Sequence, residues 1–254
     1  MRTKSLAAAA TVGFMILLAH GLAAEAAEIK VLSAAAMRPA LNELGPRLEC
    51  ETGHKLVIQY DVVGVLKRQI EGGERFDVAI LTTSFIDDLA KQGKIAADTR
   101  ANIARSGIGV VVRAGAPKPD IKSADAFKRV MVNAKSIGYS REGATAMYLA
   151  SLFERLGIAE QMKAKTKYMQ PGRAAQSVAD GEAELGLVVI SAIEPGPGAE
   201  LLGPLPAELQ HYVGYTGGIG ADAKEAKAGK AFSEFLRAPA AVPVLKAKGL
   251  EPTL

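Results

Sequence analysis

Residues 28–33 read Glu-Ile-Lys-Val-Leu-Ser, a short β-like run that ends at a serine. Residues 38–51 follow with Leu41, Leu44 and Leu48 at helical spacing, and Gly53 stands where a helix C-cap belongs. Further expected strands are 55–60 and 76–81, and further expected helices are 65–71 and 84–91. Strands and helices that alternate through short links predict a parallel sheet with helices on both faces.

A second unit of strands and helices begins where the pattern changes, close to residue 108. The expected strands are 107–113, 136–140, 165–169, 184–190 and 210–217, and the expected helices are 124–132, 144–156, 172–180, 222–236 and 240–248. Residues 196–206 are rich in Gly and Pro, which predicts a loop. The last two helices have no strands of their own, which suggests that they return to the first unit. We therefore expect two α/β units with breaks near residues 108 and 212.

The first residues have the pattern of a secretory signal peptide. Two basic residues precede an apolar run over residues 6–18, and Ala24-Glu25-Ala26 offers small residues at the positions that a signal peptidase recognises. We expect a signal peptide of residues 1–26, cleaved after Ala26 or alternatively after Ala24. A membrane anchor is the less favoured interpretation, because the apolar run is shorter than the ~20 residues of a span. The pattern thus predicts an exported, periplasmic protein.

Composition and motifs exclude several classes of function. The chain has 31 Lys and Arg against 27 Asp and Glu, scattered along it, and only 5% aromatic residues, so nucleic acid is a poor candidate partner. Cys50 has no second cysteine to pair with, and its place among apolar positions predicts a buried, inert thiol. His54 and His211 lack a metal-like spacing to other ligands. With no P-loop, G-x-S-x-G or H-E-x-x-H motif, the sequence predicts no metal and no cofactor.

Residues 138–145, Gly-Tyr-Ser-Arg-Glu-Gly-Ala-Thr, join an expected strand to an expected helix. A helix that starts after a Gly-containing turn presents free backbone N–H groups and the positive end of its dipole. Ser140 and Ala144 lie in this turn, and Arg141 adds a planar set of donors suited to carboxylate or phosphate. The stretch therefore predicts an anion-binding turn.

Other strand ends supply further candidates, because ligands of parallel α/β sheets bind outside the carboxyl ends of the strands. The candidates are Ser33 and Ala34 after the first strand, Asp61, Val62 and Val63 after the second, Thr83 after the third, and Ser191 in the second unit. Each hydroxyl taken alone is most simply a helix N-cap. Taken together, hydroxyls and helix N-termini from two units predict a neutral-to-positive pocket for a dehydrated anion.

The order of these elements resembles a known family. The segments that carry the resemblance are Ile29–Ala36, Leu66–Gly73, Phe76–Ala79 and the C-terminal stretch Phe235–Pro252. They resemble periplasmic solute-binding proteins with the type II fold, and most closely the molybdate-binding proteins of ABC importers. The resemblance implies two α/β lobes, each a sheet flanked by helices, joined by two crossing strands near 108–113 and 210–216. Lobe 1 would comprise 27–108 plus 215–254, and lobe 2 would comprise 109–214.

The same resemblance implies a monomer that captures a small anion and delivers it to an ABC transporter permease. Ser33 matches the family serine after the first strand, but the Gly-Ser-Ser-Gly-like element after the second strand is replaced by Asp61-Val-Val-Gly64. An acid beside a dianion is repulsive, and Arg141 is better matched to a carboxylate. The ligand could therefore be a molybdate-like oxyanion or an organic carboxylate.

The alternative is an enzyme on the same scaffold. A divergent branch of this family, aconitate isomerase, acts on a tricarboxylate and must move an allylic proton, which needs a base in the cleft. Asp61 would be the first candidate for the base, with a turn-stabilising role as its simpler explanation. Arg141 would be the carboxylate clamp, and Tyr60 or Tyr139 could assist.

Overall fold

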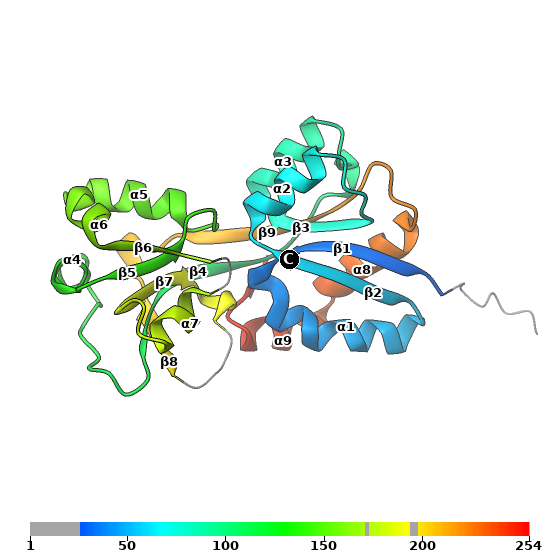
Figure 1. Ribbon diagram of the computed structural model, residues 1–254. Coiled ribbons are helices and arrows are strands. Elements are labelled where there is room, and N and C mark those ends of the chain that lie inside the picture. Colours follow the sequence, from blue (N-terminus) through cyan, green and yellow to red (C-terminus); the bar gives the residue numbers. More distant parts are fainter. Residues whose placement is uncertain (1–25, 171–172, 194–197, 254) are drawn as a thin grey trace, which may run out of the picture.

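The computed structural model describes residues 26–170, 173–193 and 198–253. The expected signal peptide, apart from Ala26, lies outside the described residues. Within them, no helix has the length and apolar character needed to cross a membrane. The described chain forms two α/β lobes that lie side by side, with two long strands running between them (Figure 1).

Lobe 1 is built on three parallel strands, β1 (Glu28–Ala34), β2 (Lys55–Asp61) and β3 (Val78–Thr82), with β1 in the middle. The antiparallel strand β9 (Tyr212–Ile219) extends the sheet beyond β3. Its helices are α1 (Arg38–Thr52), α2 (Val63–Glu71), α3 (Thr83–Lys91), α8 (Ala226–Arg237) and α9 (Val242–Ala247). These helices cover both faces of the sheet, as expected (Figure 1).

Lobe 2 repeats the plan with β5 (Ile137–Ser140) parallel to β6 (Thr166–Met169) and to β7 (Leu185–Val189). Its helices are α4 (Ala124–Asn133), α5 (Ala146–Arg155), α6 (Ala159–Lys165) and α7 (Ala174–Ala179). Short 3₁₀ turns complete the fold at η1 (Ala35–Met37), η2 (Ala97–Thr99), η3 (Ile190–Ala192), η4 (Ala207–Leu209) and η5 (Pro239–Ala241). Strands β1, β2 and β3 of lobe 1 and strands β5, β6 and β7 of lobe 2 thus pair in parallel, whereas β9 is antiparallel, so the sheet as a whole is mixed.

The strand β4 (Ala101–Arg113) belongs to both lobes. Its first half pairs antiparallel with β9, and its second half pairs antiparallel with β7. At the point where β9 leaves, the side chain of Gln210 accepts from the Ile108 N–H at 2.8 Å and donates to the Ile108 carbonyl at 3.1 Å. A side-chain amide therefore takes the place of a neighbouring strand for the Ile108 N–H, while the Ile108 carbonyl also accepts from the Leu205 N–H at 3.0 Å.

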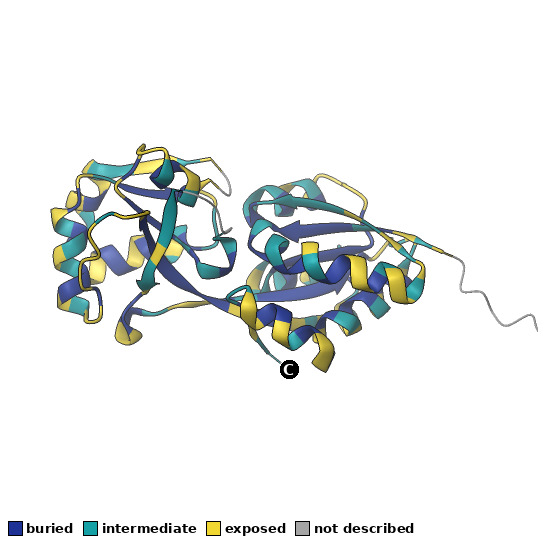
Figure 2. Ribbon diagram, turned by 90° about the horizontal axis from the view of Figure 1, so that it is seen from below, coloured by how far each residue is buried: buried dark blue, intermediate teal, exposed yellow. Residues whose placement is uncertain are grey.

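Each lobe has its own hydrophobic core. In lobe 1, Leu41, Leu44 and Leu48 are buried against the sheet as their spacing predicts. Phe232 and Leu236 of α8 belong to the same core, so this C-terminal helix packs against the strands of lobe 1. The core of lobe 2 gathers around β4, β5, α4 and α5. Buried segments follow the strands through the centre of both lobes (Figure 2).

Two local predictions were wrong. Cys50 is exposed rather than buried, because it lies in α1 two residues beyond Leu48 and so on the opposite side of the helix. The expected loop 196–206 contains β8 (Ala199–Pro204), which pairs antiparallel with β4. Its proline is the last residue of the strand, and strands tolerate proline at such boundary and edge positions. The short strand β10 (Glu251–Pro252) also pairs with β4.

A close backbone approach in lobe 1 gives a test of this packing. A Cβ atom on Gly220 would lie 2.6 Å from the carbonyl oxygen of Phe76. Because backbone yields less readily than a side-chain tip, we expect Gly220→Ala to lower the free energy of unfolding by roughly 1–3 kcal/mol. Urea denaturation measures this change.

Gly203→Ala is the matched control, because its Cβ would meet only the Ile121 side chain at 3.5 Å. We expect its effect to stay within about 0.5 kcal/mol. Equal losses in the two variants would contradict the tight contact at Gly220.

Candidate functional site

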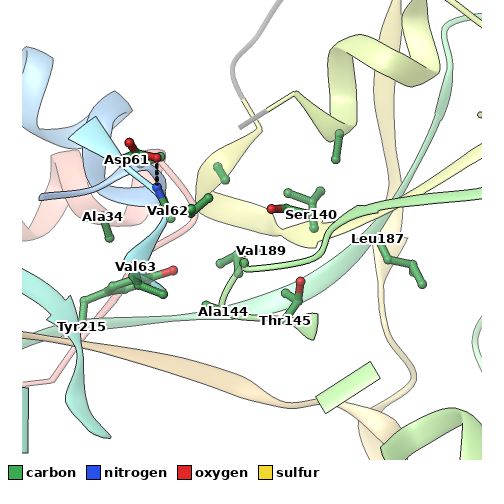
Figure 3. A pocket seen from close by; sticks show the side chains of 16 residues that line it. Ala34, Asp61, Val62, Val63, Ser140, Ala144, Thr145, Leu187, Val189 and Tyr215 are labelled. Carbon is green, nitrogen blue, oxygen red and sulfur yellow. Dashed lines mark hydrogen bonds between the residues drawn. The ribbon is translucent and has the colours of Figure 1, made fainter. Parts of the chain in front are cut away.

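A cavity lies between the lobes, at the carboxyl ends of strands from both sheets. Its volume is about 70 Å³, several times the roughly 10–15 Å³ that one water requires. Lobe 1 contributes the ends of β1 and β2, and lobe 2 contributes the turn after β5 and the end of β7 (Figure 3). The lining residues are Ala34, Ala35, Ala36, Asp61, Val62, Val63, Ser140, Gly143, Ala144, Thr145, Ala174, Leu187, Val188, Val189, Ala192 and Tyr215.

Two helices begin at this cavity, one from each lobe. The N-cap of α2 is Val62 and the N-cap of α5 is Thr145, and neither side chain makes a capping hydrogen bond. The first N–H groups of a helix have no partner within the helix, and they carry the positive end of its dipole. The Ala146 N–H is bonded to the Gly143 carbonyl at 3.1 Å, but the positive dipole ends of both helices border the cavity, an arrangement suited to an anionic group.

Asp61 places a carboxylate on the lobe 1 side of the cavity. Its Oδ1 accepts a hydrogen bond from the Val62 N–H at 2.7 Å (Figure 3). The acid thus takes up one backbone donor at the start of α2 and sets a negative charge there. The donors of lobe 2 have no such charge among the lining residues, so the two sides of the cavity differ electrostatically.

Tyr215 of β9 contributes a hydroxyl from the crossing strand. The residue is 1% exposed, and its Oη has no hydrogen-bond partner among the described residues. Burial raises the pKa of Tyr215, and the neighbouring Ser191 hydroxyl opposes part of that rise. The phenol stays protonated at neutral pH and is a ready donor. Buried hydroxyls nearly always have partners, and for Tyr215 the neighbouring Ser191 hydroxyl or a group in the adjoining cavity could supply one.

Five of the nine expected ligand-binding residues line this cavity, and Asp61 lies beside them. The five are Ala34, Val62, Val63, Ser140 and Ala144. Ser33 is fully buried, with its hydroxyl 3.4 Å from the carbonyl oxygen of Ala34. The Thr83 hydroxyl is hydrogen-bonded to Thr216 of β9 at 2.9 Å, and Ser191 is buried. Neither residue lines the cavity.

Arg141 lies outside the cavity and lines a second, more polar pocket in lobe 2. Neither Tyr60 nor Tyr139, expected as assisting groups, lines the cavity. The Tyr60 hydroxyl donates to Asn42 at 3.1 Å, and burial raises the pKa of Tyr60 to about 12.

Sequence reasoning missed several lining residues, of which Thr145 and Tyr215 carry hydroxyls. Thr145 lies in the quoted turn 138–145, so its position was a usable signal. Tyr215 offered none, because a buried aromatic residue in a strand looks like an ordinary core residue.

Comparisons with known proteins agree with this architecture. The sequence profile of the family described as "Bacterial extracellular solute-binding protein" matches residues 29–251. An aconitate isomerase from a Pseudomonas species is 31% identical over 230 residues, covering 88% of this chain and 87% of that protein. The molybdate-binding protein ModA of Azotobacter vinelandii is 29% identical over 241 residues, covering 89% and 91%.

Solved structures show the same fold. The periplasmic molybdate-binding protein of Azotobacter vinelandii superposes with a TM-score of 0.74 at 21% identity, covering 89% of this chain and 99% of that one. The sulfate-binding protein SubI of Mycobacterium tuberculosis H37Rv gives a TM-score of 0.71 at 17% identity, covering 89% and 87%. The expected type II binding-protein fold is confirmed. The chain belongs to the family of bacterial extracellular solute-binding proteins, and its fold is shared with proteins that bind small oxyanions.

Proposed function

We propose that this protein captures a small organic carboxylate in the cavity between its lobes. The observation that carries the proposal is the Asp61 carboxylate, which lines the cavity and is fixed to the start of α2. A compact dianion such as molybdate would sit close to this negative charge and be repelled by it. An organic acid can keep its carboxylate away from Asp61 and place a hydroxyl, a protonated carboxyl or a C–H group there instead.

The lobe 2 side suits the carboxylate itself. The N-terminus of α5 provides backbone donors there, and Ser140 and Thr145 add hydroxyls. Tyr215 contributes a further donor from β9. Hydrogen bonds to a charged group are stronger than those between neutral groups, so a few well-placed donors can hold one carboxylate without a bound metal.

The family supports a role outside the cytoplasm. An exported chain of this fold, released after Ala26, would bind its ligand as a monomer and pass it to the permease of an ABC importer. The expected leader and the match to extracellular binding proteins support this role.

A second candidate function is isomerisation of an unsaturated tricarboxylate. It is favoured by the 31% identity to an aconitate isomerase and by the presence of a carboxylate base in the cavity. Asp61 would accept a proton from the carbon next to the double bond and return it at the other end of the allylic unit. The double bond would shift, no atom would be gained or lost, and Asp61 would end as it began.

Replacement of Asp61 by Asn tests the electrostatic argument. We expect the wild-type protein to bind organic carboxylates and to bind molybdate and sulfate weakly. Asp61→Asn removes the negative charge, so the affinity for molybdate should rise by roughly tenfold or more, since one such step is about 1.4 kcal/mol. Isothermal calorimetry with trans-aconitate, molybdate and sulfate measures these affinities. Sub-micromolar molybdate binding by the wild-type protein would overturn the proposal.

The same variant separates binding from catalysis. An ultraviolet assay of trans-aconitate isomerisation should show turnover in the wild-type protein and none in Asp61→Asn if the protein is an isomerase. Binding of trans-aconitate without turnover in the wild-type protein would exclude that activity and leave the binding role.

Tyr215→Phe tests the unpaired phenol. The change removes only the hydroxyl, so we expect ligand affinity to fall by roughly tenfold to a hundredfold, the value of a hydrogen bond to a charged group. Thermal stability without ligand should be unchanged or slightly higher, because the hydroxyl has no partner among the described residues. Tyr212→Phe on the same strand is the control, since Tyr212 is 41% exposed and does not line the cavity. Equal affinity in both variants would show that Tyr215 does not contact the ligand.

A further inference from the structure

A second pocket opens beside the cavity on the lobe 2 side, and we call it the polar vestibule. Its volume is about 490 Å³, far larger than that of the cavity. Ser140 lines both spaces, so the two adjoin at the end of β5. The vestibule is lined by Ser140, Arg141, Glu142, Tyr168, Met169, Gln170, Arg173, Ser177 and Glu182.

Arg141 is held in the vestibule by aromatic stacking. Its guanidinium carbon lies 4.1 Å from the centre of the Tyr168 ring. Tyr168 in turn meets Tyr139 edge-to-face with ring centres 5.6 Å apart, and Tyr139 is buried. A guanidinium that packs one flat face on an aromatic ring keeps its edge donors available for a carboxylate. Tyr168 itself is 52% exposed, so the stacking accounts for an aromatic side chain that the core does not use.

The described ion pairs near Arg141 do not include its guanidinium. Of the two acids that line the vestibule, Glu142 is paired with Arg68 of α2 across the lobes at 2.8 Å. Arg173 lies 3.6 Å from Asp180. Among the residues that the structure describes, no carboxylate forms an ion pair with Arg141. Glu182 is the remaining acid of the lining. Its negative charge would repel an anion, which would therefore bind on the side of Arg141.

We infer that the polar vestibule binds a second carboxylate of the ligand, with Arg141 as its bidentate partner. The ligand is then a di- or tricarboxylate that extends past Ser140, with one carboxylate in the cavity and another against Arg141. This inference rests on the proposed function, because it names the class of organic carboxylate that the cavity would take. A tetrahedral oxyanion has no second group that could reach Arg141, whereas a polycarboxylate uses both spaces.

The shape of the vestibule agrees with this assignment. The cavity alone has room for a compact group, and its walls are largely alanine, valine and leucine. The vestibule is larger and is lined mostly by charged and polar side chains, which suits a hydrated second carboxylate and a variable remainder of the ligand. Selection between mono- and polycarboxylates would therefore occur at Arg141 rather than in the cavity.

The test compares ligands that differ in their number of carboxylates. Isothermal calorimetry would use tricarballylate, succinate and butyrate with the wild-type protein and with Arg141→Gln. We expect the variant to lose roughly tenfold to a hundredfold in affinity for tricarballylate and succinate, and to bind butyrate as the wild-type protein does. Arg141→Lys should fall between the two, because an ammonium keeps the charge but lacks the planar pair of donors.

Arg129→Gln is the matched control. Arg129 is an exposed arginine of α4 in the same lobe, and it lines neither space. Its loss should leave all three affinities unchanged, and circular dichroism would verify that each variant is folded. An equal fall for butyrate and tricarballylate in Arg141→Gln, or no fall at all, would overturn the assignment of the vestibule while the cavity proposal stands. Absence of any carboxylate binding by the wild-type protein would overturn both.

Discussion

The structure depends on one strand, β4, which forms backbone hydrogen bonds with strands of both lobes. β4 runs unbroken through 13 residues, pairing first with β9 and then with β7 and β8. Between these partners the Gln210 side chain binds the Ile108 N–H and shares the Ile108 carbonyl with the Leu205 N–H. Because β4 continues from one lobe into the other, the strand ends of the two lobes meet at the same cavity. An arrangement of lobes that pivot on a few strand residues also permits closure around a ligand.

The position of the crossing explains the composition of the site. β9 passes beside the cavity, so Tyr215 of this crossing strand forms part of its wall. The turn after β5 and the start of α2 meet across the opening, where Arg68 and Glu142 form an ion pair between the lobes. Both side chains are well exposed, so this pair adds little stability and acts mainly as a contact at the rim. The polar groups of the site are thus contributed by both lobes and by the strand between them.

Sequence patterns predicted the parts of this arrangement that depend on local order. The leucine spacing of α1 and the alternation of strands and short helices identify the layers, because those patterns reflect which face of an element is buried. The Gly and Pro content of residues 196–206 predicted a loop in place of β8, because the pairing of β8 with β4 is a long-range contact that local composition does not report. The place of Tyr215 at the cavity wall was hidden, because it depends on where β9 crosses. Arg141 was expected to meet a carboxylate, but its place outside the cavity was not expected, and neither was its stacking on Tyr168, a ring 27 positions further along the chain.

The distribution of charge along the cleft argues for an elongated ligand. In a site for a symmetric dianion, donors on both sides would be open and no fixed negative charge would be needed. Here Asp61 neutralises part of the α2 terminus, while the donors of α5 have no acid among the cavity residues. Arg141 extends the positive side beyond Ser140, into a space that a compact anion in the cavity would leave empty. Attraction therefore increases from lobe 1 toward the polar vestibule, and a ligand gains most when its charges are spread in that direction. A chain with two or three carboxylates meets this condition, and its uncharged or proton-bearing part would then face Asp61.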